Sequence, residues 1–418
     1  MERKSNYPFV LVAGLLSYGE EEFLSRFLPY FGLWKTDVRK LYRDKDVRCY
    51  IPSLGPFSSA WDKACELYAA IVGGTVDYGK AHSEKHGHER YGRTYRQALI
   101  PEWGKLDAEG KLQKINLIGY SLGAPVMRVF VELLVSGSQE EREVTPEYSL
   151  SELFRGGHEE WVHSVTSLCG AHEGTTAVYL LQKFKVLNLL LYLAALCCCL
   201  LGHTPLAAIF DPRLDQFNLS VEPGTSWMPR IKFKKIKQFV RSNDNVVCDC
   251  FPHVARERNE TFTNKTYDNI YYFSYSADAT IKHKKSYKVR KGVLKKFFPL
   301  LVTTWFLIHY KSKSVDQKTG EIIYSDIWCP NDGGVNLISN IAPFGDPQEE
   351  LLPETLIKTG VWYTVVEEGK THMSYSGLGE KDKVHKKFYL DLLNRINSLD
   401  TNGATMVLQS TGYSFLPQ

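Results

Sequence analysis

One serine of this 418-residue chain lies in a pattern that could make it a nucleophile. The pattern is Gly119-Tyr120-Ser121-Leu122-Gly123, which matches G-x-S-x-G. An apolar run from Ile115 precedes it, as in a buried strand, and residues 125–135 follow with apolar side chains at helical spacing. A strand, a tight turn and a helix form an elbow that strains the serine backbone and needs small residues on either side. The pattern predicts that Ser121 can attack an acyl carbon.

A serine nucleophile needs a histidine as general base, and in this elbow fold the histidine comes last in the chain. Only His372 and His385 lie beyond Asp332. His385 lies among three lysines of a predicted terminal helix, and we expect it to be solvated. His372 follows a predicted strand in a loop that contains glycine, which favours it as the base.

The acid that orients the histidine should lie between the serine and the histidine. Asp332 is in a sharp turn after an apolar strand, which favours it, and Asp326 and Asp346 are the alternatives. The oxyanion of an acyl intermediate needs two backbone N–H groups. We predict that these belong to Leu122, directly after the serine, and to Leu15, in the turn after the first strand.

Predicted strands and helices alternate along the chain, which indicates an α/β fold with a mostly parallel central sheet and flanking helices. We expect residues 1–418 to form one domain. The predicted strands are 9–12, 47–52, 115–119, 162–168, 270–275, 322–324 and 360–366, and helices are expected at 125–135, 293–307 and 384–399. Residues 169–176 should lie at the carboxyl edge of the sheet, where open α/β proteins bind ligands.

The composition is that of an ordinary globular protein. The net charge of +4 is too small to argue for nucleic acid as a partner, and the odd count of nine cysteines leaves at least one unpaired. Sequons at Asn218, Asn259 and Asn264 suggest a secreted protein or the lumen of a eukaryotic secretory pathway. Membrane association is the alternative location.

Residues 186–201 are the most apolar part of the chain and are slightly too short to span a bilayer. We favour a mobile helix that covers the active site, within a lid and cap region at 175–240. A membrane anchor is the alternative. Residues 232–237 are strongly basic and could contact an anionic surface, although a solvated helix face has the same pattern.

A polar excursion at residues 55–105 contains Asp62, His82, His86 and His88. Imidazoles and a carboxylate together could hold a zinc ion, which prefers four ligands. Surface histidines in a glycine-rich loop would give the same sequence. The spacing of His82 and His88 exceeds one helical turn, so a shared site would need a loop.

The chain resembles the bacterial true lipases of family I.5, of the Geobacillus and Staphylococcus type, which contain zinc. The resemblance covers most of residues 8–220 and is weaker later, where it is confined to Cys248-Asp249, Asn331-Asp332-Gly333 and the His372 loop. Its clearest segments are Pro56–Glu66, Val72–Gly79, His86–Tyr95, Gly137–Glu143, Leu153–His158 and His172–Thr176.

The resemblance implies a structural zinc ion held by Asp62, His82, His88 and Asp249, and it implies that His86 is not a ligand. The family's calcium site uses an acid shortly after the catalytic histidine, whereas this chain has Ser374 there, and this departure argues against a calcium requirement. The chain also departs from the family at Ala13 and Leu122, but the predicted oxyanion donors are backbone groups and can survive both changes.

These observations predict a lipase or carboxylesterase that hydrolyses acylglycerol esters at a lipid interface through a Ser-His-Asp triad. Two other functions fit parts of the sequence. A phospholipid acylhydrolase could use residues 186–201 as a membrane anchor, and a non-catalytic protein of the same fold could bind lipid. Acyl length and head group leave no trace in the sequence.

Overall fold

A computed structural model describes residues 7–201, 205–219, 231–293, 300–315, 322–399 and 406–407. Its centre is a seven-stranded sheet with the strand order β12-β14-β7-β6-β5-β1-β2, and all neighbouring strands are parallel. The strands are β1 (Phe9–Val12), β2 (Cys49–Tyr50), β5 (Ile115–Tyr120), β6 (Val162–Leu168), β7 (Tyr271–Asp278), β12 (Gln348–Glu350) and β14 (Trp362–Glu368). The predicted α/β fold with a mostly parallel sheet is confirmed.

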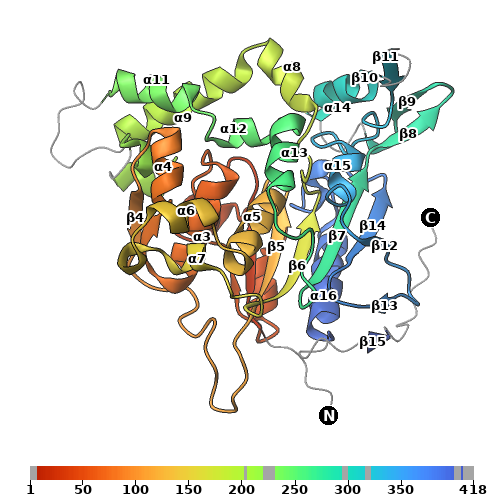
Figure 1. The fold of residues 1–418 in the computed structure, drawn as a ribbon. Coiled ribbons are helices and arrows are strands. Elements are labelled where there is room, and N and C mark those ends of the chain that lie inside the picture. The colour runs from red at the N-terminus through yellow and green to blue at the C-terminus, as the bar shows by residue number, and fades with distance from the viewer. Residues whose placement is uncertain are drawn as a thin grey trace.

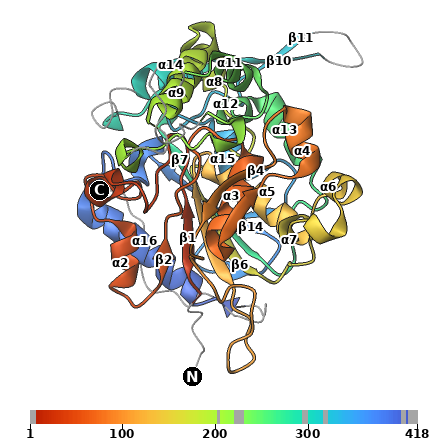
Figure 2. The ribbon, with the colours of Figure 1, turned by 90° about the vertical axis from the view of Figure 1, so that its left-hand side faces the viewer.

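Helices cover both faces of this sheet. Successive side chains of a strand point to opposite sides, and in β1 both sets of side chains are apolar and need cover. Val10 and Val12 of β1 pack in one cluster with α3 (Ala60–Val72) and α5 (Gly123–Val135). Phe9 and Leu11 pack in another cluster with α2 (Val38–Arg43) and α16 (Asp382–Asn397). Figure 2 shows α2 and α16 on one side of the sheet and α3, α5 and α7 (Glu152–Arg155) on the other.

The carboxyl ends of the strands lie under a cap of helices, at the top of Figure 1. These helices are α8 (Ala177–Lys183), α9 (Val186–Leu201), α11 (Phe233–Arg241), α12 (Val246–Asp249) and α13 (Pro252–Glu260). A third apolar cluster joins the buried side of α9 to Phe239 and Val246. No single helix of the described chain is long and apolar enough to cross a membrane. Together, α8 and α9 have the length and composition of a membrane span, but they are bent by 79° relative to each other.

A long excursion follows β7 in the sequence, before the chain reaches the last two strands of the sheet. It contains β8 (Thr280–His283), β9 (Ser286–Val289), α14 (Leu300–His309), β10 (Ser312–Val315) and β11 (Ile322–Ser325). Its two ends meet, because the N–H of Ala279 donates to the carbonyl of Asn331 over 2.9 Å. The chain therefore returns to the carboxyl end of β7 before it continues into α15 (Leu337–Ile341).

A second excursion, after α3, contains β3 (Gly74–Asp77), α4 (Lys80–His86) and β4 (Tyr91–Tyr95). The remaining described elements are α1 (Leu24–Phe27), α6 (Gln139–Val144), β13 (Leu356–Ile357), β15 (Met406–Val407) and the short 3-10 helices at Glu147–Ser149, Pro205–Ala208, Asp215–Phe217 and His372–Ser374.

Most predicted elements are present with shifted ends. The strand expected at 322–324 is not part of the central sheet, because β11 pairs with β10 in a separate antiparallel ribbon. The helix expected at 293–307 is found from Leu300 to His309, and residues 294–299 lie outside the described part of the chain. The predicted apolar helix has the bounds of α9.

Candidate active site and metal-ligand cluster

Ser121 lies in the turn between β5 and α5, as the sequence predicts. Its φ angle is +57°, a left-handed conformation that non-glycine residues seldom adopt. The turn is held because the N–H of Ser121 donates to the carbonyl of Leu168 at the end of β6 over 2.9 Å. A Cβ atom at Gly123 would lie 2.2 Å from the carbonyl oxygen of Val12, so a larger residue would displace the elbow.

A chain of hydrogen bonds links Ser121 to two residues from the later part of the sequence. The Ser121 hydroxyl lies 2.9 Å from Nε2 of His372, and Nδ1 of His372 lies 2.8 Å from Oδ2 of Asp332. The acid therefore favours the tautomer in which Nδ1 carries the proton and Nε2 accepts one from the serine. Elements far apart in sequence place the three predicted residues in hydrogen-bond contact.

The Asp332 carboxylate is fully buried and accepts several hydrogen bonds. Oδ1 accepts from the N–H groups of Gly334 and Val335, and Oδ2 accepts from the side-chain amide of Asn340 over 2.8 Å. These donors stabilise the ionised carboxylate away from water. Because the preceding excursion returns to the end of β7, Asp332 lies at the carboxyl edge of the sheet beside the other two residues.

The loop after β1 runs against the elbow. A Cβ atom at Gly14 would lie 2.8 Å from Cβ of Ser121 and 3.3 Å from the backbone nitrogen of Leu122, so this approach requires glycine. The hydroxyl of Tyr30 donates to the carbonyl of Leu15 over 2.9 Å and fixes the next peptide. The segments that carry both predicted oxyanion donors, Leu15 and Leu122, are thus adjacent.

Cys169 is a neighbour of this site that the sequence analysis did not single out. Its Sγ, a carboxylate oxygen of Asp332 and a ring nitrogen of His372 all lie within 4.8 Å of one another. Burial, with the nearby Asp332 charge, raises the pKa of the Cys169 thiol well above its usual value, so the thiol stays neutral. The sequence did contain a signal for Cys169, because this residue directly follows a strand whose carboxyl end was expected to bind ligands.

The cap covers the elbow. Leu122 packs in one apolar cluster with Val178 of α8 and with Leu187 and Leu191 of α9. Only 7% of the Ser121 surface is exposed.

The other sequence candidates for the triad have different environments. Asp346 forms an ion pair with Arg128 over 3.2 Å and accepts from the indole of Trp362. His385 is buried with 3% exposure, which corrects the expectation that it is solvated. Its Nε2 lies 3.2 Å from the carbonyl of Thr36, and burial lowers its pKa to about 4. It helps to fasten α16 to the N-terminal part of the chain.

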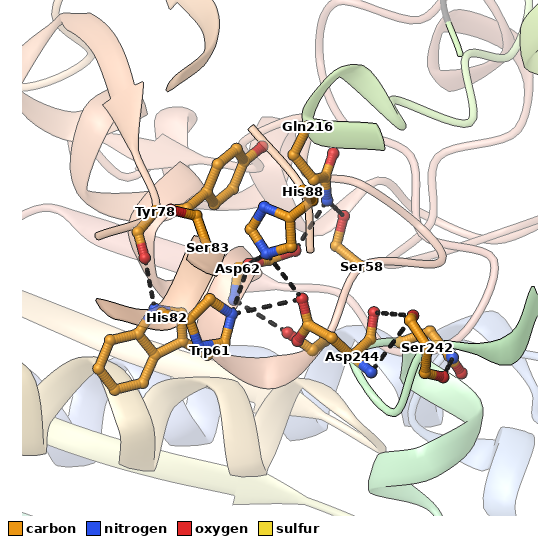
Figure 3. A network of polar contacts seen from close by, with 12 residues as sticks. Ser58, Trp61, Asp62, Tyr78, His82, Ser83, His88, Gln216, Ser242 and Asp244 are labelled. Carbon is orange, nitrogen blue, oxygen red and sulfur yellow. Dashed lines mark hydrogen bonds and ion pairs between the residues drawn. The ribbon is translucent and has the colours of Figure 1, made fainter. Parts of the chain in front are cut away.

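Figure 3 shows a second polar cluster, between α3, α4 and the loop before α12. Asp62, His82, His88 and Asp244 each offer one ligand atom, and these atoms all lie within 4.8 Å of one another. Nε2 of His82 is 3.3 Å from carboxylate oxygens of both Asp62 and Asp244, and Nε2 of His88 is 3.1 Å from Asp244. Yet Asp62 Oδ1 and His88 Nε2 are buried without a hydrogen bond of good geometry.

Other contacts orient these four side chains. Nδ1 of His88 faces the carbonyl of Glu89 over 2.9 Å, which leaves Nε2 for the cluster. The amide of Gln216 donates to the second oxygen of Asp62 over 2.8 Å. The rings of Trp61 and His82 are stacked with centroids 4.9 Å apart. Outer contacts of this kind commonly orient metal ligands.

The charges of the cluster favour a cation at its centre. Burial and the charge of Asp244 raise the pKa of Asp62, because two carboxylates cannot both ionise easily in a buried site. Burial disfavours a charged His82, but its bonds to Asp244 and Asp62 outweigh this effect and raise its pKa to about 9. Two imidazole nitrogens and two carboxylate oxygens are also a donor set that suits zinc.

The structure does not place Asp249, the fourth predicted ligand, in this cluster. Its carboxylate pairs with Arg258 over 3.1 Å and accepts from the N–H of Ala60 over 2.7 Å, where it caps α3. Asp244 takes its place in the cluster. Asp249 was assigned only through the resemblance, which is weak in this half of the chain.

We then compared the chain with known proteins. The family model described as "Lipase-like, C-terminal domain" matches residues 5–400. The chain belongs to this family.

Among curated proteins, Lipase 1 of Staphylococcus aureus is 30% identical over 388 residues, which are 92% of this chain and 52% of that protein. The chain therefore spans about half the length of the curated relatives it matches. A Staphylococcus epidermidis lipase is 31% identical over 91% of this chain and 51% of its own length.

Solved structures agree with this family. Lipase 1 from Pelosinus fermentans is 34% identical, with a TM-score of 0.74 over 94% of this chain and 99% of that chain. The Staphylococcus hyicus lipase is 27% identical, with a TM-score of 0.78 over 94% and 97% of the two chains. EstA from Clostridium botulinum is 31% identical, with a TM-score of 0.75 over 96% and 89%. These neighbours bear out the fold as that of an α/β-hydrolase.

Proposed function

We propose that this chain is a serine hydrolase that cleaves carboxylic esters of lipids. The observation that carries the proposal is the hydrogen-bonded series Ser121, His372 and Asp332 at the elbow of the sheet. The lipases that the chain resembles support the reaction class. The substrate is an acyl ester presented by a lipid interface.

The reaction would follow the order of the hydrogen bonds. The Ser121 Oγ attacks the acyl carbon while Nε2 of His372 takes its proton, and Asp332 stabilises the imidazolium that forms. The N–H groups of Leu15 and Leu122 hold the oxyanion. His372 then gives the proton to the departing alcohol, and water, activated by the same histidine, releases the acid and restores Ser121.

The test is loss of activity in Ser121→Ala with the fold retained. We expect turnover to fall by about four orders of magnitude, and His372→Ala to fall as far. His385→Ala is the matched control and should keep most of the turnover, because His385 contacts Thr36 rather than the site. A fluorophosphonate should label the parent protein and not Ser121→Ala.

Near-parental turnover in Ser121→Ala would refute the proposal. Absence of both labelling and ester hydrolysis in the parent protein would point to the non-catalytic lipid-binding protein.

We also propose that Asp62, His82, His88 and Asp244 hold one zinc ion. The two buried atoms that lack a good hydrogen bond, and the close approach of two carboxylates, support a bound cation. With four protein ligands the ion has no open position, so it would stabilise the fold and take no part in hydrolysis.

We further propose that α8 and α9 form a lid. Its support is the packing of Val178, Leu187 and Leu191 on Leu122, directly after the serine. Such a lid would stay closed in water, because opening exposes apolar surface at a high free-energy cost. Against lipid this cost is small, so the lid would open there. The bent apolar pair α8 and α9 also leaves the anchored phospholipid acylhydrolase as a second candidate.

We also propose that the protein is located outside the cell or in the lumen of the secretory pathway. Of the three sequons, Asn218 and Asn264 are exposed, whereas the amide of Asn259 is engaged with the carbonyl of His172 and with Glu173. After expression in eukaryotic cells we expect glycosidase treatment to increase the mobility of the parent protein, and not that of the double variant Asn218→Gln, Asn264→Gln. No change in the parent would argue against this route.

A further inference from the structure

Four segments around the cap contain basic residues and no acidic ones. Residues 177–201, 231–241, 280–293 and 300–313 together contain 15 lysines and arginines and no aspartate or glutamate. The whole chain has 51 basic and 47 acidic residues, so the part outside these segments is net acidic. Such a separation of charge gives a protein one face that attracts anions. We call the exposed part of these four segments the cap face.

The four segments are neighbours in space. Helix α8 contacts α9 and α14, α9 contacts α11, and α14 contacts β9 of the hairpin. Figure 1 shows them along the top of the molecule, from α11 and α9 to the hairpin β8–β9. The basic residues are thus part of one continuous surface.

The middle of the cap face is apolar. Leu189 and Leu193, one turn apart on α9, are 59% and 54% exposed, and Val302 and Trp305 on α14 are 63% and 62% exposed. Each helix therefore presents an apolar ridge to the outside while its other side packs on the protein. Monomeric proteins seldom leave such patches exposed unless a partner or a membrane covers them.

Lysines surround these ridges. Exposed lysines lie beside Phe184 between α8 and α9, on α11 and at the tip of the hairpin: Lys183, Lys185, Lys234, Lys237, Lys282, Lys284 and Lys285. Arg290, at the base of the hairpin, is instead paired with Glu368 over 2.8 Å. Apolar side chains flanked by lysines match a lipid surface, which offers apolar depth beneath anionic head groups.

We propose that the cap face docks peripherally on lipid surfaces that carry anionic phospholipid head groups. A second copy of the chain is a poorer occupant, because pairing the same face would bring like charges together. Spanning is disfavoured because Leu187, Leu191 and Cys198 of α9 are buried in the protein. The choice of substrate surface rests on the proposed function, whereas docking itself needs no catalysis.

Docking would bring lipid to the elbow. The apolar cluster under α9 includes Leu122, next to the serine. On the other side, the hydroxyl of Thr303 in α14 donates to the carbonyl of Gly333, next to Asp332, over 2.5 Å. Both apolar ridges therefore belong to helices that pack against residues adjacent to the candidate site.

The experiment measures vesicle binding of the full chain as Ser121→Ala, which leaves the lipid intact. Vesicles of phosphatidylcholine are compared with vesicles of phosphatidylcholine and phosphatidylserine by cosedimentation. We expect the partition coefficient to be at least about tenfold higher with phosphatidylserine and to fall as salt is raised.

Two variants divide the contributions to binding. Charge reversal at Lys282, Lys284 and Lys285 should abolish the preference for phosphatidylserine, and Trp305→Ala should weaken binding to both vesicles by roughly threefold or more. The matched control reverses Lys40, Lys45 and Lys105, which are exposed outside the cap face, and should bind like the parent. With Ser121 restored, both charge variants should hydrolyse a soluble short-chain ester at the parental rate.

Equal binding to the two vesicles, or equal loss in the control, would overturn the proposal while leaving the hydrolase intact. Retention in membranes after carbonate extraction would overturn it in favour of an integral anchor. A dimer in solution that Trp305→Ala dissociates, without vesicle binding, would assign the face to a second copy of the chain. Loss of short-ester hydrolysis in the parent would contradict the proposed function alone.

Discussion

Single positions decide which side chains join the candidate metal cluster, and the two aspartates near α12 illustrate this. Asp244 precedes the N-cap residue of α12 and points its carboxylate at His82 and His88. Asp249, five residues later, faces the N-terminus of α3. Both belong to the same short segment, but only one can reach the cluster.

We therefore expect Asp244→Asn to lower the zinc content of the purified protein from about one ion per chain, and Asp249→Asn to leave it unchanged. Loss of a ligand also removes a cross-link between distant segments, so the melting temperature of Asp244→Asn should fall by roughly 5 °C or more. Elemental analysis and thermal unfolding of both variants measure this. Metal-free parent protein, or full zinc content in Asp244→Asn, would contradict the assignment.

The sequence brought Ser121, Asp332 and His372 together as one candidate site because each lies in a distinct local context: an elbow, a sharp turn and a loop after a strand. It did not indicate Asp244, since a residue that joins a cluster from a distant loop has no local pattern. His385 could have been recognised as buried. It shares a helical face with Tyr389, Leu392 and Ile396, all buried, and the neighbouring lysines obscured this spacing.

At the scale of elements, the cap differs from the other helices because its apolar residues face both inward and outward. Leu191 is buried against the elbow cluster, whereas Leu189 of the same helix is exposed. In the proposed lid, Leu191 belongs to the closed contact and Leu189 to the outer surface. The two residues therefore give the lid proposal a matched test.

We expect activity on a short-chain ester to be low below its solubility limit and to rise several-fold above it. Leu191→Asp should raise the activity below the limit, because a carboxylate buried in the closed state favours opening. Leu189→Asp should not, since its side chain is already in water. Kinetics that run smoothly through the solubility limit, in parent and variants alike, would exclude a lid.

Helix α16 is the second element with a distinct property, because its buried His385 is disfavoured in the charged form. The pKa of about 4 lies below that of an unfolded histidine, near 6.5. Above pH 6.5 the residue is neutral in both states and has no effect on stability. As the pH falls towards 4, the unfolded chain takes up the proton first, and the fold loses up to roughly 3 kcal/mol.

His385→Gln removes this proton uptake and can still donate to the Thr36 carbonyl. Its urea unfolding midpoint should fall less than that of the parent between pH 6.5 and 4.5. His283→Gln, on exposed β8, is the control and should follow the parent. Parallel curves for the parent and His385→Gln would refute the role of His385.

At the scale of the whole molecule, the order of strands and helices was largely predictable and the path of the chain between them was not. The buried strand β1 is a continuous apolar run, which a sequence displays directly. The excursion after β7 carries apolar and β-rich segments of its own, so its ribbon of β10 and β11 was indistinguishable from a strand of the main sheet.

That excursion begins and ends at one hydrogen bond, between Ala279 and Asn331. The carboxylate of Asp332, which follows it, is held by Gly334, Val335 and Asn340. Within the excursion, Thr303 bonds to the neighbouring Gly333 carbonyl, and the carbonyls of Trp328 and Cys329 accept from Asn336 and Asn331. The exposed tip of the hairpin β8–β9, at residues 282–285, lies away from these bonds and can change without displacing Asp332, provided that Thr303 and residues 328–330 remain. Exchange of that tip would then alter the surface proposed to bind lipid while the candidate site keeps its geometry.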